Sequence, residues 1–437
     1  MIELIILIVF AGSLFICIGL DISILYALLF GYVLFFCYGI YTRHTIREML
    51  FFSLSGIKTI KNILITFLLI GIITALWRAC GTIPYIVYYS TGFCTPQTMV
   101  LFTFLLCCLI SYLTGTAFGT SATMGVICAT LANSMGVPVL FTGGAVLSGS
   151  YFGDRCSPMS TSALLVSSLT HTDLFRNIRL MIKTSLFPFI ISCFLYLLAG
   201  MSVDSLPVQN EMRELFMEHF VFHPVVLIPA AVIVLFSLFR INVRLTMTVS
   251  VLTSIVIAVS LQNFSISEVI RSAILGYRPT DPDISILLSG GGVISMLKVC
   301  MIVCISSCYS GMFDGTGLLK HIRAAIENIS EKITPFGGIF LTSIITGMIS
   351  CNQTLTIMLT HQLCSETEKN PEHMASHLEN TAVVIPPLIP WSIASTVTLT
   401  AVNAPMLCIL TGFYLYLLPI WNLFIAVIKK FSIRRTQ

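Results

Sequence analysis

Residues 148–162 form a polar run inside an otherwise apolar stretch of the sequence. The run contains a carboxylate at Asp154, a guanidinium at Arg155 and a helix-breaking proline at Pro158. A proline removes one backbone hydrogen bond from a helix, and the freed carbonyl oxygens can coordinate a small cation. Hydroxyl groups that could complete such a site belong to Ser157, Ser160, Thr161 and Ser162. We therefore expect cation binding or proton transfer at Asp154, with Na⁺ near Asp154, Ser157 and Thr161. The alternative is an internal ion pair between Asp154 and Arg155 that holds helices together.

Residues 379–392 form a second polar run, which is rich in proline. Prolines at 386, 387 and 390 must interrupt any helix that passes through this segment. The run begins with Glu379 and Asn380, which are candidate ligands for an ion or a substrate. Glu379 is equally well explained as an acidic residue at a solvated helix start, where negative charge is favourable.

Two segments rich in glycine and threonine, 113–121 and 345–353, supply neutral oxygen atoms. The candidate ligands at or next to these segments are Thr116, Thr120, Ser121, Asn352, Gln353 and Thr354. Such donors suit a desolvated ion or an organic group, and the N-terminus of a half-helix favours an anion. Arg78 and Asp314 are further charged residues inside apolar stretches, and an ion pair between them would serve either structure or mechanism.

The overall composition indicates where these polar groups must lie. Of the 437 residues, 56% are hydrophobic and 10% are charged, and the mean hydropathy is +0.96, whereas soluble domains carry about 25% charged residues. The formal net charge of +4 comes from residues at segment ends, so it indicates membrane topology and not a nucleic-acid surface. The 15 cysteines lack metal-ligand spacing and are read as reduced packing residues. The chain is expected to lie in a lipid bilayer.

Apolar stretches long enough to cross a bilayer, about 20 residues each, recur along the chain. The first is read as a span and not as a signal peptide, because Glu3 stands where a signal peptide has Lys or Arg. The ten predicted spans lie near 2–19, 22–41, 62–88, 139–166, 181–201, 222–240, 244–262, 290–312, 379–403 and 405–428. Two further apolar stretches, 97–134 and 336–365, contain the segments rich in glycine and threonine.

Basic residues predict the orientation, because cytoplasmic loops carry an excess of Lys and Arg. Basic clusters stand at 43–61, 176–183, 240–244 and 429–435, while the acidic segment 203–221 belongs outside. All the basic clusters fall inside only if 97–134 and 336–365 each enter the membrane and return to the same face as a helical hairpin. Irregular backbone is not tolerated in lipid, so both hairpin tips must be buried in protein or face water.

Three landmarks recur in the same order in the two halves of the chain. They are residues 77–81 against 313–317, Thr114-Gly115 against Thr346-Gly347, and residues 157–159 against 386–388. The first copy starts inside and the second outside, which is typical of an inverted repeat; chance similarity is the alternative. We predict an all-α polytopic membrane protein with about ten transmembrane helices plus two re-entrant helical hairpins, an inverted-repeat transporter fold with discontinuous helices.

The repeat also divides the chain into five parts. They are N-terminal membrane helices with a basic cytoplasmic loop at 1–61, the first repeat at 62–180, linking scaffold helices at 181–285, the second repeat at 286–404, and a C-terminal helix with a basic cytoplasmic tail at 405–437.

Several segments of the chain resemble the NhaC-type sodium/proton antiporter family, part of the ion transporter superfamily. The resemblance begins near residue 60 and rests on 69–84, 115–125, 148–158, 172–175 and 387–391. It implies Na⁺/H⁺ exchange by alternating access, and Asp154 matches the family's Gly-Asp-Lys/Arg-x-Ser-Pro element. Members of the family also exchange organic acids such as malate and lactate.

Three positions depart from the pattern of that family. The family usually has an acidic residue after Ser-Pro-x-Ser, an Asp after the glutamate at 379, and an Asp near the second tip, where this chain has Thr161, Asn380 and Asn352. Fewer carboxylates weaken the attraction for a cation in a low-dielectric site. The alternative function is therefore a cation-coupled carrier or exchanger of a small organic anion or an amino acid.

Other function classes find little support in the sequence. Walker motifs, a His-Glu-x-x-His motif and a Gly-x-Ser-x-Gly motif are missing, so an enzyme is not expected; a channel or a non-transporting sensor is the third class. Expected partners are membrane lipid, small ions or a small organic substrate, and a second copy of the chain as a homodimer, with no nucleic acid. No cofactor is expected besides transported Na⁺ and H⁺. The expected location is the bacterial cytoplasmic (inner) membrane, with both termini on the cytoplasmic side.

Overall fold

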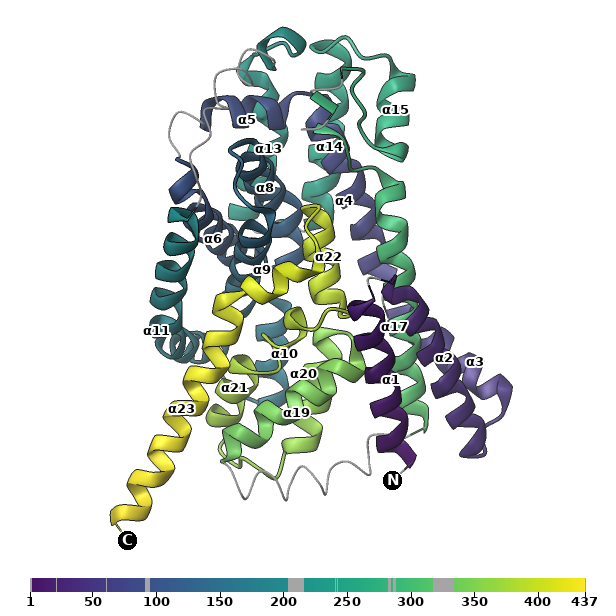
Figure 1. Cartoon of the computed structure of the whole chain (residues 1–437), viewed down its shortest axis with the longest axis vertical. Helices are drawn as coiled ribbons and strands as arrows, with labels where there is room; N and C mark the ends of the chain where they lie inside the picture. The colour runs from purple at the N-terminus through teal and green to yellow at the C-terminus, as the bar shows by residue number, and fades with distance from the viewer. Residues whose placement is uncertain are drawn as a thin grey trace.

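A computed structural model describes most of the chain as one helical bundle. The described residues are 2–20, 22–59, 61–90, 95–202, 216–239, 241, 243–281, 284–285, 288–316 and 334–436. Within them, helices are the regular structure, and β-pairing is limited to a single bridge between Tyr277 and Gly290. Both chain ends lie at one end of the bundle (Figure 1), which we call the lower end; α5 and α15 lie at the opposite, upper end.

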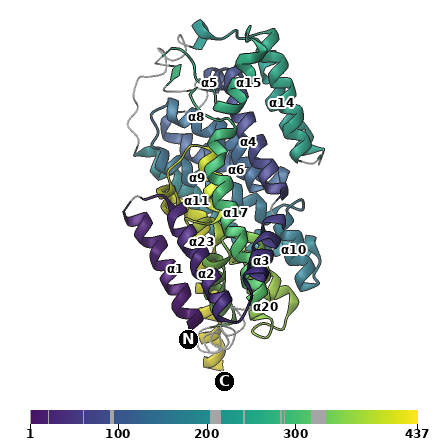
Figure 2. The same cartoon turned by 90° about the vertical axis from the view of Figure 1, so that its right-hand side faces the viewer.

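The N-terminal helices pack beside the lower half of a long helix, α17 (Val293–Thr316). They are α1 (Ile2–Gly19), α2 (Ile24–Tyr41) and α3 (Ile46–Thr59). Figure 2 shows α1 and α2 on one side of α17 and α3 on the other. The aromatic rings of Phe10, Phe35 and Tyr309 pack edge to face in this contact.

The predicted basic loop within 1–61 is instead largely occupied by helix α3. Two glycines explain this difference: a Cβ at Gly56 would lie 1.9 Å from the Ser307 carbonyl oxygen, and a Cβ at Gly311 would lie 1.9 Å from that of Phe52. Small residues allow the backbones of two membrane helices to approach closely. The segment therefore folds as a helix against α17, although its basic ends suggested a loop.

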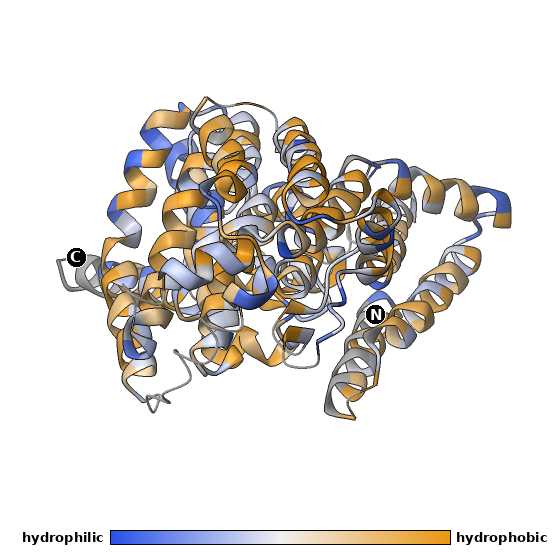
Figure 3. Cartoon of the chain, turned by 90° about the horizontal axis from the view of Figure 1, so that it is seen from above, coloured by the Kyte–Doolittle hydropathy of each residue, from blue (hydrophilic) through white to orange (hydrophobic). Residues whose placement is uncertain are grey.

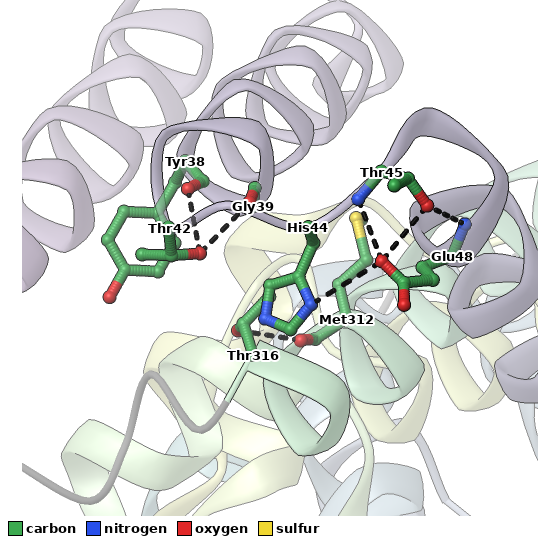
Figure 4. Close-up of polar contacts among 8 residues, drawn as sticks. All are labelled: Tyr38, Gly39, Thr42, His44, Thr45, Glu48, Met312 and Thr316. Atoms are coloured by element: carbon green, nitrogen blue, oxygen red, sulfur yellow. Dashed lines mark hydrogen bonds and ion pairs between the residues drawn. The ribbon is translucent and has the colours of Figure 1, made fainter.

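The connection between α2 and α3 is a tight polar turn (Figure 4). The backbone N–H of Thr45 donates to the Glu48 carboxylate at 2.8 Å, and its hydroxyl does so at 2.9 Å. The Glu48 N–H donates back to the Thr45 hydroxyl oxygen, as in a capping box. The backbone donor and then the hydroxyl of Thr45 hold the pKa of Glu48 below its usual range.

The predicted span at 62–88 is two helices. Helix α4 (Lys61–Ala79) runs toward the upper end beside α17, and α5 (Thr82–Ser90) lies across the upper end (Figure 1). The direction changes at Gly81, whose φ of 83° is in the left-handed region that favours glycine. An apolar stretch alone does not reveal this turn, because α4 and α5 have similar compositions.

A helical hairpin forms within the apolar stretch 97–134. Helix α6 (Pro96–Thr114) descends from the upper end, and α7 (Ala117–Thr120), a π-helical turn η1 (Ser121–Gly125) and α8 (Val126–Ser134) lead back toward α5 (Figure 1). The turn is at Gly115, with φ 67°, as the sequence predicted. A Cβ at this glycine would lie 2.5 Å from the Met159 carbonyl carbon, so only glycine fits here.

The next predicted span, 139–166, is interrupted where Pro158 predicted. Helix α9 (Val139–Cys156) runs parallel to α6, and α10 (Thr161–Thr170) follows after a break of four residues. At Gly153, an added Cβ would lie 2.1 Å from the backbone of Ser111 on α6. Helix α11 (Leu174–Met201) then returns to the upper end, where Gly200 meets Gln97.

A group of helices at the upper end links the two halves. They are η2 (Pro224–Leu227), α13 (Ile228–Leu238), α14 (Val243–Ser260) and α15 (Ile266–Leu275). Helices α13, α14 and α17 occupy the predicted spans at 222–240, 244–262 and 290–312, whereas α15 was not predicted. Most of the acidic segment 203–221, at 203–215, and the basic residue Arg240 lie outside the described residues.

The second half repeats the hairpin and the interrupted helix. Its elements are α19 (Pro335–Ser350), α20 (Gln353–Cys364), α21 (Pro371–Asn380), η4 (Pro386–Leu388), α22 (Ile393–Ala401), η5 (Met406–Thr411) and α23 (Phe413–Thr436). Gly347, which the sequence suggested as the tip, lies inside α19. The turn comes at Cys351, with φ 54°, because Asn352 starts the next helix by accepting from the Thr354 N–H.

Apolar residues occur along most of the helices (Figure 3), and large apolar side chains are found exposed as well as buried. Four helices within the described ranges are long and apolar enough to cross a membrane: α6, α11, α17 and α23. On α11 the side chains of Leu186, Ile190 and Phe194 are all more than half exposed. A row of apolar side chains at this helical spacing faces lipid and not water, so the chain is a multi-pass membrane protein.

Candidate functional site

The two interrupted helices cross in opposite directions in the middle of the molecule. The start of α9, at Gly143, meets Ala404 after the end of α22, whereas the end of α9, at Arg155, meets Asn380 at the end of α21. Each hairpin tip packs on the break of its own half: Gly115 lies against Met159, and the Cys351 carbonyl accepts from the Ile393 N–H at 2.8 Å. Polar groups from four chain segments therefore converge at one place.

Asp154 lies at this crossing and contacts both hairpin tips. Its carboxylate accepts from Gln353 Nε2 at 3.0 Å, at the start of α20, and from the backbone N–H of Ala117, at the start of α7. The Ser162 hydroxyl, on α10, is 3.3 Å from the same carboxylate. Asp154 is 6% exposed. One carboxylate thus joins the first interrupted helix to the tips of both hairpins.

The break after α9 is closed by serine hydroxyls that were among the predicted ligands. Ser160 and Ser162 both donate to the Asp154 carbonyl oxygen, which the interruption leaves without its helical partner. Ser157 accepts from the Met159 N–H at 3.1 Å and is buried. These hydroxyls satisfy exposed backbone groups at the break, as buried polar groups require, and they leave oxygen lone pairs near Asp154.

Arg155 is fully buried and is bonded to neutral acceptors on three other elements. Nε donates to the Glu379 carbonyl at 3.0 Å, and Nη2 donates to Asn380 Oδ1 at 2.5 Å. Further bonds reach the Met181 carbonyl, Thr184 Oγ1 and Tyr414 OH. A guanidinium offers five donors in a rigid planar fork. Arg155 therefore holds α9, α11, α21 and α23 together.

The sequence left open an internal pair between Asp154 and Arg155, and the structure does not form it. Neighbouring residues on a helix point about 100° apart, since a helix has 3.6 residues per turn. Asp154 faces Gln353 and the hairpin tips, whereas Arg155 faces Asn380 and α11. The two charges consequently take separate partners.

Glu379 provides the second carboxyl group of the site. Its side chain is fully buried, and neither Oε1 nor Oε2 has a hydrogen-bond partner among the described residues. Arg155 and Asp154 are both close enough to act on it electrostatically. A solvated residue at a helix start, the second reading from sequence, is therefore wrong for Glu379.

The charges at the crossing do not balance. Two carboxyl groups, Asp154 and Glu379, lie within electrostatic reach of one guanidinium, Arg155. Removing an ionised group from water costs several kcal/mol unless it is paired. With both carboxyls ionised the site has one negative charge too many, which a single proton or a single Na⁺ can neutralise.

The remaining predicted ligands lie around this centre or away from it. Thr120 and Ser121 are buried but donate to carbonyls of their own hairpin, and Thr116 and Asn352 act as helix N-caps. Thr161 and Thr354 are exposed, although they neighbour Ser162 and Gln353. A helix places successive residues on different faces, which adjacency in the sequence does not show.

The suggested ion pair between Arg78 and Asp314 is not compatible with the fold. Arg78 ends α4 at the upper end, next to Gly290, which precedes α17. Asp314 is 21 positions after Val293 on α17, a separation of about 31 Å along a helix. Matching positions of an inverted repeat lie at opposite ends, which separates the two. The side chain of Asp314 lies outside the described residues.

Comparison with known proteins assigns the chain to a family. A family model described as the Na⁺/H⁺ antiporter family matches residues 2–173 and 149–427. The chain belongs to the Na⁺/H⁺ antiporter family. This family is a family of antiporters and not of enzymes.

Individual relatives of the Na⁺/H⁺ antiporter family match most of the chain. An uncharacterised Na⁺/H⁺ antiporter of Haemophilus influenzae is 28% identical over 357 residues, which are 77% of this chain and 75% of the relative. The malate-2H⁺/Na⁺-lactate antiporter of Bacillus subtilis is 25% identical over 387 residues, 85% and 82% of the two chains. The Na⁺/H⁺ antiporter NhaC of Bacillus subtilis is 26% identical over 388 residues, 86% of each chain.

Several residues of this candidate site could not be found from the sequence. The Met181 carbonyl, Thr184 and Tyr414 all contact Arg155, and the Ala117 N–H contacts Asp154. They lie in ordinary apolar helices or in a backbone turn, and no motif marks them. A buried arginine requires acceptors, which predicts that such partners exist but not which helices supply them.

Proposed function

We propose that the chain exchanges Na⁺ for H⁺ across a membrane by alternating access, with Asp154 and Glu379 as its ion-carrying groups. The observation that carries this proposal is the buried pair of carboxyl groups, one on each interrupted helix, beside a single guanidinium whose hydrogen bonds go to neutral acceptors. Membership of the Na⁺/H⁺ antiporter family supports it.

In this mechanism a proton and Na⁺ compete for the same excess negative charge. When the site is protonated, two carboxyls and Arg155 sum to zero charge. When the proton leaves, Na⁺ restores the balance by binding at Asp154, where the Ser162 hydroxyl lies 3.3 Å from the carboxylate. Gln353 and the Ala117 N–H keep the Asp154 carboxylate oriented. Since the site prefers one cation at a time, ion uptake on one side requires ion release on the other.

We further propose that the two hairpins are re-entrant and that about ten helices span the membrane. Gly115 and Cys351 are both left-handed turn residues, each followed by an extended N-cap residue, Thr116 or Asn352. This matching geometry, together with the opposite directions of α9 and α22, supports an inverted repeat. The shared lower end of the termini and the basic residues there support cytoplasmic termini in a bacterial inner membrane (Figure 1).

A transport measurement tests the proposal directly. The purified protein is reconstituted into proteoliposomes with a pH dye inside, and an inward Na⁺ gradient is applied. We expect alkalinisation of the lumen, because protons leave as Na⁺ enters, and no response to K⁺ at the same concentration. A lumen pH that does not respond to Na⁺ at any pH between 6 and 9, in vesicles that hold folded protein, would sink the proposal.

A second candidate is exchange of a small organic acid coupled to cations. It is favoured by the neutral Asn352 and Asn380 at positions where carboxylates were expected, and by the similarity to the malate-2H⁺/Na⁺-lactate antiporter. The same proteoliposomes distinguish the two functions. Uptake of labelled lactate or malate that depends on a Na⁺ gradient would favour the second candidate.

A further inference from the structure

Arg78 is a buried guanidinium outside the site described above, and no carboxylate among the described residues pairs with it. It is 9% exposed, and Nη1 donates to the Thr74 carbonyl at 2.7 Å within its own helix. Its Nε has no hydrogen-bond partner among the described residues. Thr142, which lines the same cavity as Arg78, stands 12 positions before Asp154 on α9, about 18 Å along the helix.

A cavity of about 160 Å³ adjoins this guanidinium at the upper end of the molecule. Its polar lining consists of Arg78, Thr130, Asn133, Thr142, Ser289 and Asn403. Asn133, Ser289 and Asn403 are exposed and form the mouth, whereas Thr142 is buried. The lining residues come from both halves of the repeat, since Asn133 follows the first hairpin and Asn403 follows α22. No Asp or Glu is among them.

The donors of this cavity favour a negative ligand. The hydroxyls of Thr130 and Thr142 donate to the carbonyls of Val126 and Pro138, so they do not compensate the guanidinium. A buried charge without a partner costs several kcal/mol, and Arg provides N–H groups in the geometry that matches a carboxylate. A cation is excluded by repulsion from Arg78. A cavity of order 150 Å³ holds a molecule of about six heavy atoms.

We propose that the Arg78 cavity binds a small monovalent anion, either a halide or the carboxylate group of a short organic acid. The anion accepts hydrogen bonds from Arg78 Nε and from the amide groups at the mouth, and it neutralises the buried charge. Because the lining joins the end of the first hairpin to the end of α22, a bound anion stabilises the contact between the two halves. This binding does not depend on the proposed exchange of Na⁺ and H⁺.

Thermal unfolding of the purified protein in detergent tests anion binding without any transport. The reference solution contains sodium Hepes, whose bulky sulfonate does not fit the cavity; chloride, acetate or lactate then replaces Hepes at constant Na⁺, pH and ionic strength. We expect at least one of these anions to raise the unfolding temperature of the natural chain, since a ligand that binds only the folded state stabilises it. Chloride acting alone identifies a halide site, and lactate or acetate acting at lower concentration identifies a carboxylate site.

Two variants locate the effect at the cavity. Arg78→Gln removes the charge and should lose the anion-dependent shift. Ala129→Leu fills the cavity but keeps Arg78, and it should also lose the anion-dependent shift. This variant tests anion binding in the cavity even if Arg78→Gln does not fold. The control is Arg176→Gln, which removes an exposed arginine paired with Glu372 at the lower end and should keep the whole shift. Anion shifts of equal size in the natural chain, Arg78→Gln and Ala129→Leu would overturn the proposal, as would the absence of any shift in the natural chain.

Discussion

At the scale of single residues, the chemistry of this antiporter rests on how three charged groups are partnered. Asp154 has hydrogen bonds from both hairpin tips, Arg155 has neutral acceptors on three other helices, and Glu379 has no hydrogen bond among the described residues. A buried polar group without a partner is unusual in native proteins and calls for an explanation. The proposed binding and release of an ion at Glu379 and Asp154 would supply one.

Glu379→Gln should remove the proton that the site exchanges for Na⁺. With a neutral side chain at 379, Asp154 and Arg155 already balance, so Na⁺ binds at least tenfold more weakly and displaces no proton. Adding Na⁺ to weakly buffered protein in detergent with a pH dye measures this release. We expect about one proton per Na⁺ from the natural chain, by charge balance, and none from the variant. Glu372→Gln, in an exposed pair with Arg176, is the control, and unchanged release from Glu379→Gln would remove the role assigned to Glu379.

Arg155→Lys should impair transport although it keeps the charge. An ammonium group has three donors and no planar fork, so it cannot reach the Glu379 carbonyl, the Met181 carbonyl and Asn380 together. We expect Na⁺-driven proton flux to fall by roughly 10-fold to 100-fold, as misplacement of a site by about 1 Å can cause. Arg176→Lys serves as the matched control. Full flux in Arg155→Lys would show that only the charge matters.

At the scale of elements, close helix contacts position the site. Helices α6 and α9 run parallel and touch through Gly149 and Gly153, where an added Cβ would meet the backbone of α6 at 2.7 Å and 2.1 Å. Gly153 directly precedes Asp154, so the depth at which α9 sits against α6 sets the position of the carboxylate. Packing without voids transmits such a displacement to neighbouring residues.

Gly153→Ala should therefore lower both stability and transport. Overpacking of a tight contact costs about 1–3 kcal/mol, which thermal unfolding in detergent measures as a lower midpoint. Gly12→Ala on α1 is the matched control, because a Cβ there has nothing within 4 Å. Equal unfolding temperatures for the two variants would contradict the close packing of α6 and α9.

At the scale of the whole molecule, the two interrupted helices run in opposite directions and meet at the candidate site. Each half contributes a hairpin and an interrupted helix, and α9 and α22 cross so that Tyr151 OH donates to the Ala394 carbonyl at 3.0 Å. Such a pair of halves can open to either side in turn while the site stays between them.

The orientation of the molecule predicts where its ends are accessible. Protease sites added before residue 1 and after residue 437 should both be cut in inside-out vesicles and both be protected in right-side-out vesicles, because the termini share the lower end (Figure 1). A site inserted into the acidic segment 203–215 should behave oppositely. Cleavage of the two termini in different vesicle preparations would contradict the proposed topology.

The sequence by itself determined the features that depend on local composition. Apolar length indicated a membrane protein, Pro158 and the prolines at 386–390 marked the interruptions, and Gly115 marked the first tip. The distribution of Lys and Arg required the two hairpins. Asp154 in an apolar stretch was predicted as a site residue because an intramembrane carboxylate is costly unless it has a function, and its role stays a prediction.

Only the tertiary structure decided which groups meet. Gln353 bonds to Asp154 across 199 residues, and Tyr414 bonds to Arg155 across 259; no local pattern encodes such contacts. In the structure the second turn is at Cys351 and not at Gly347, and helix α3 occupies the predicted loop. Glu379 has no hydrogen-bond partner among the described residues. Local propensity sets where a helix can start or stop, whereas the partner of a buried side chain is set by the packing of whole helices, which a single sequence does not display.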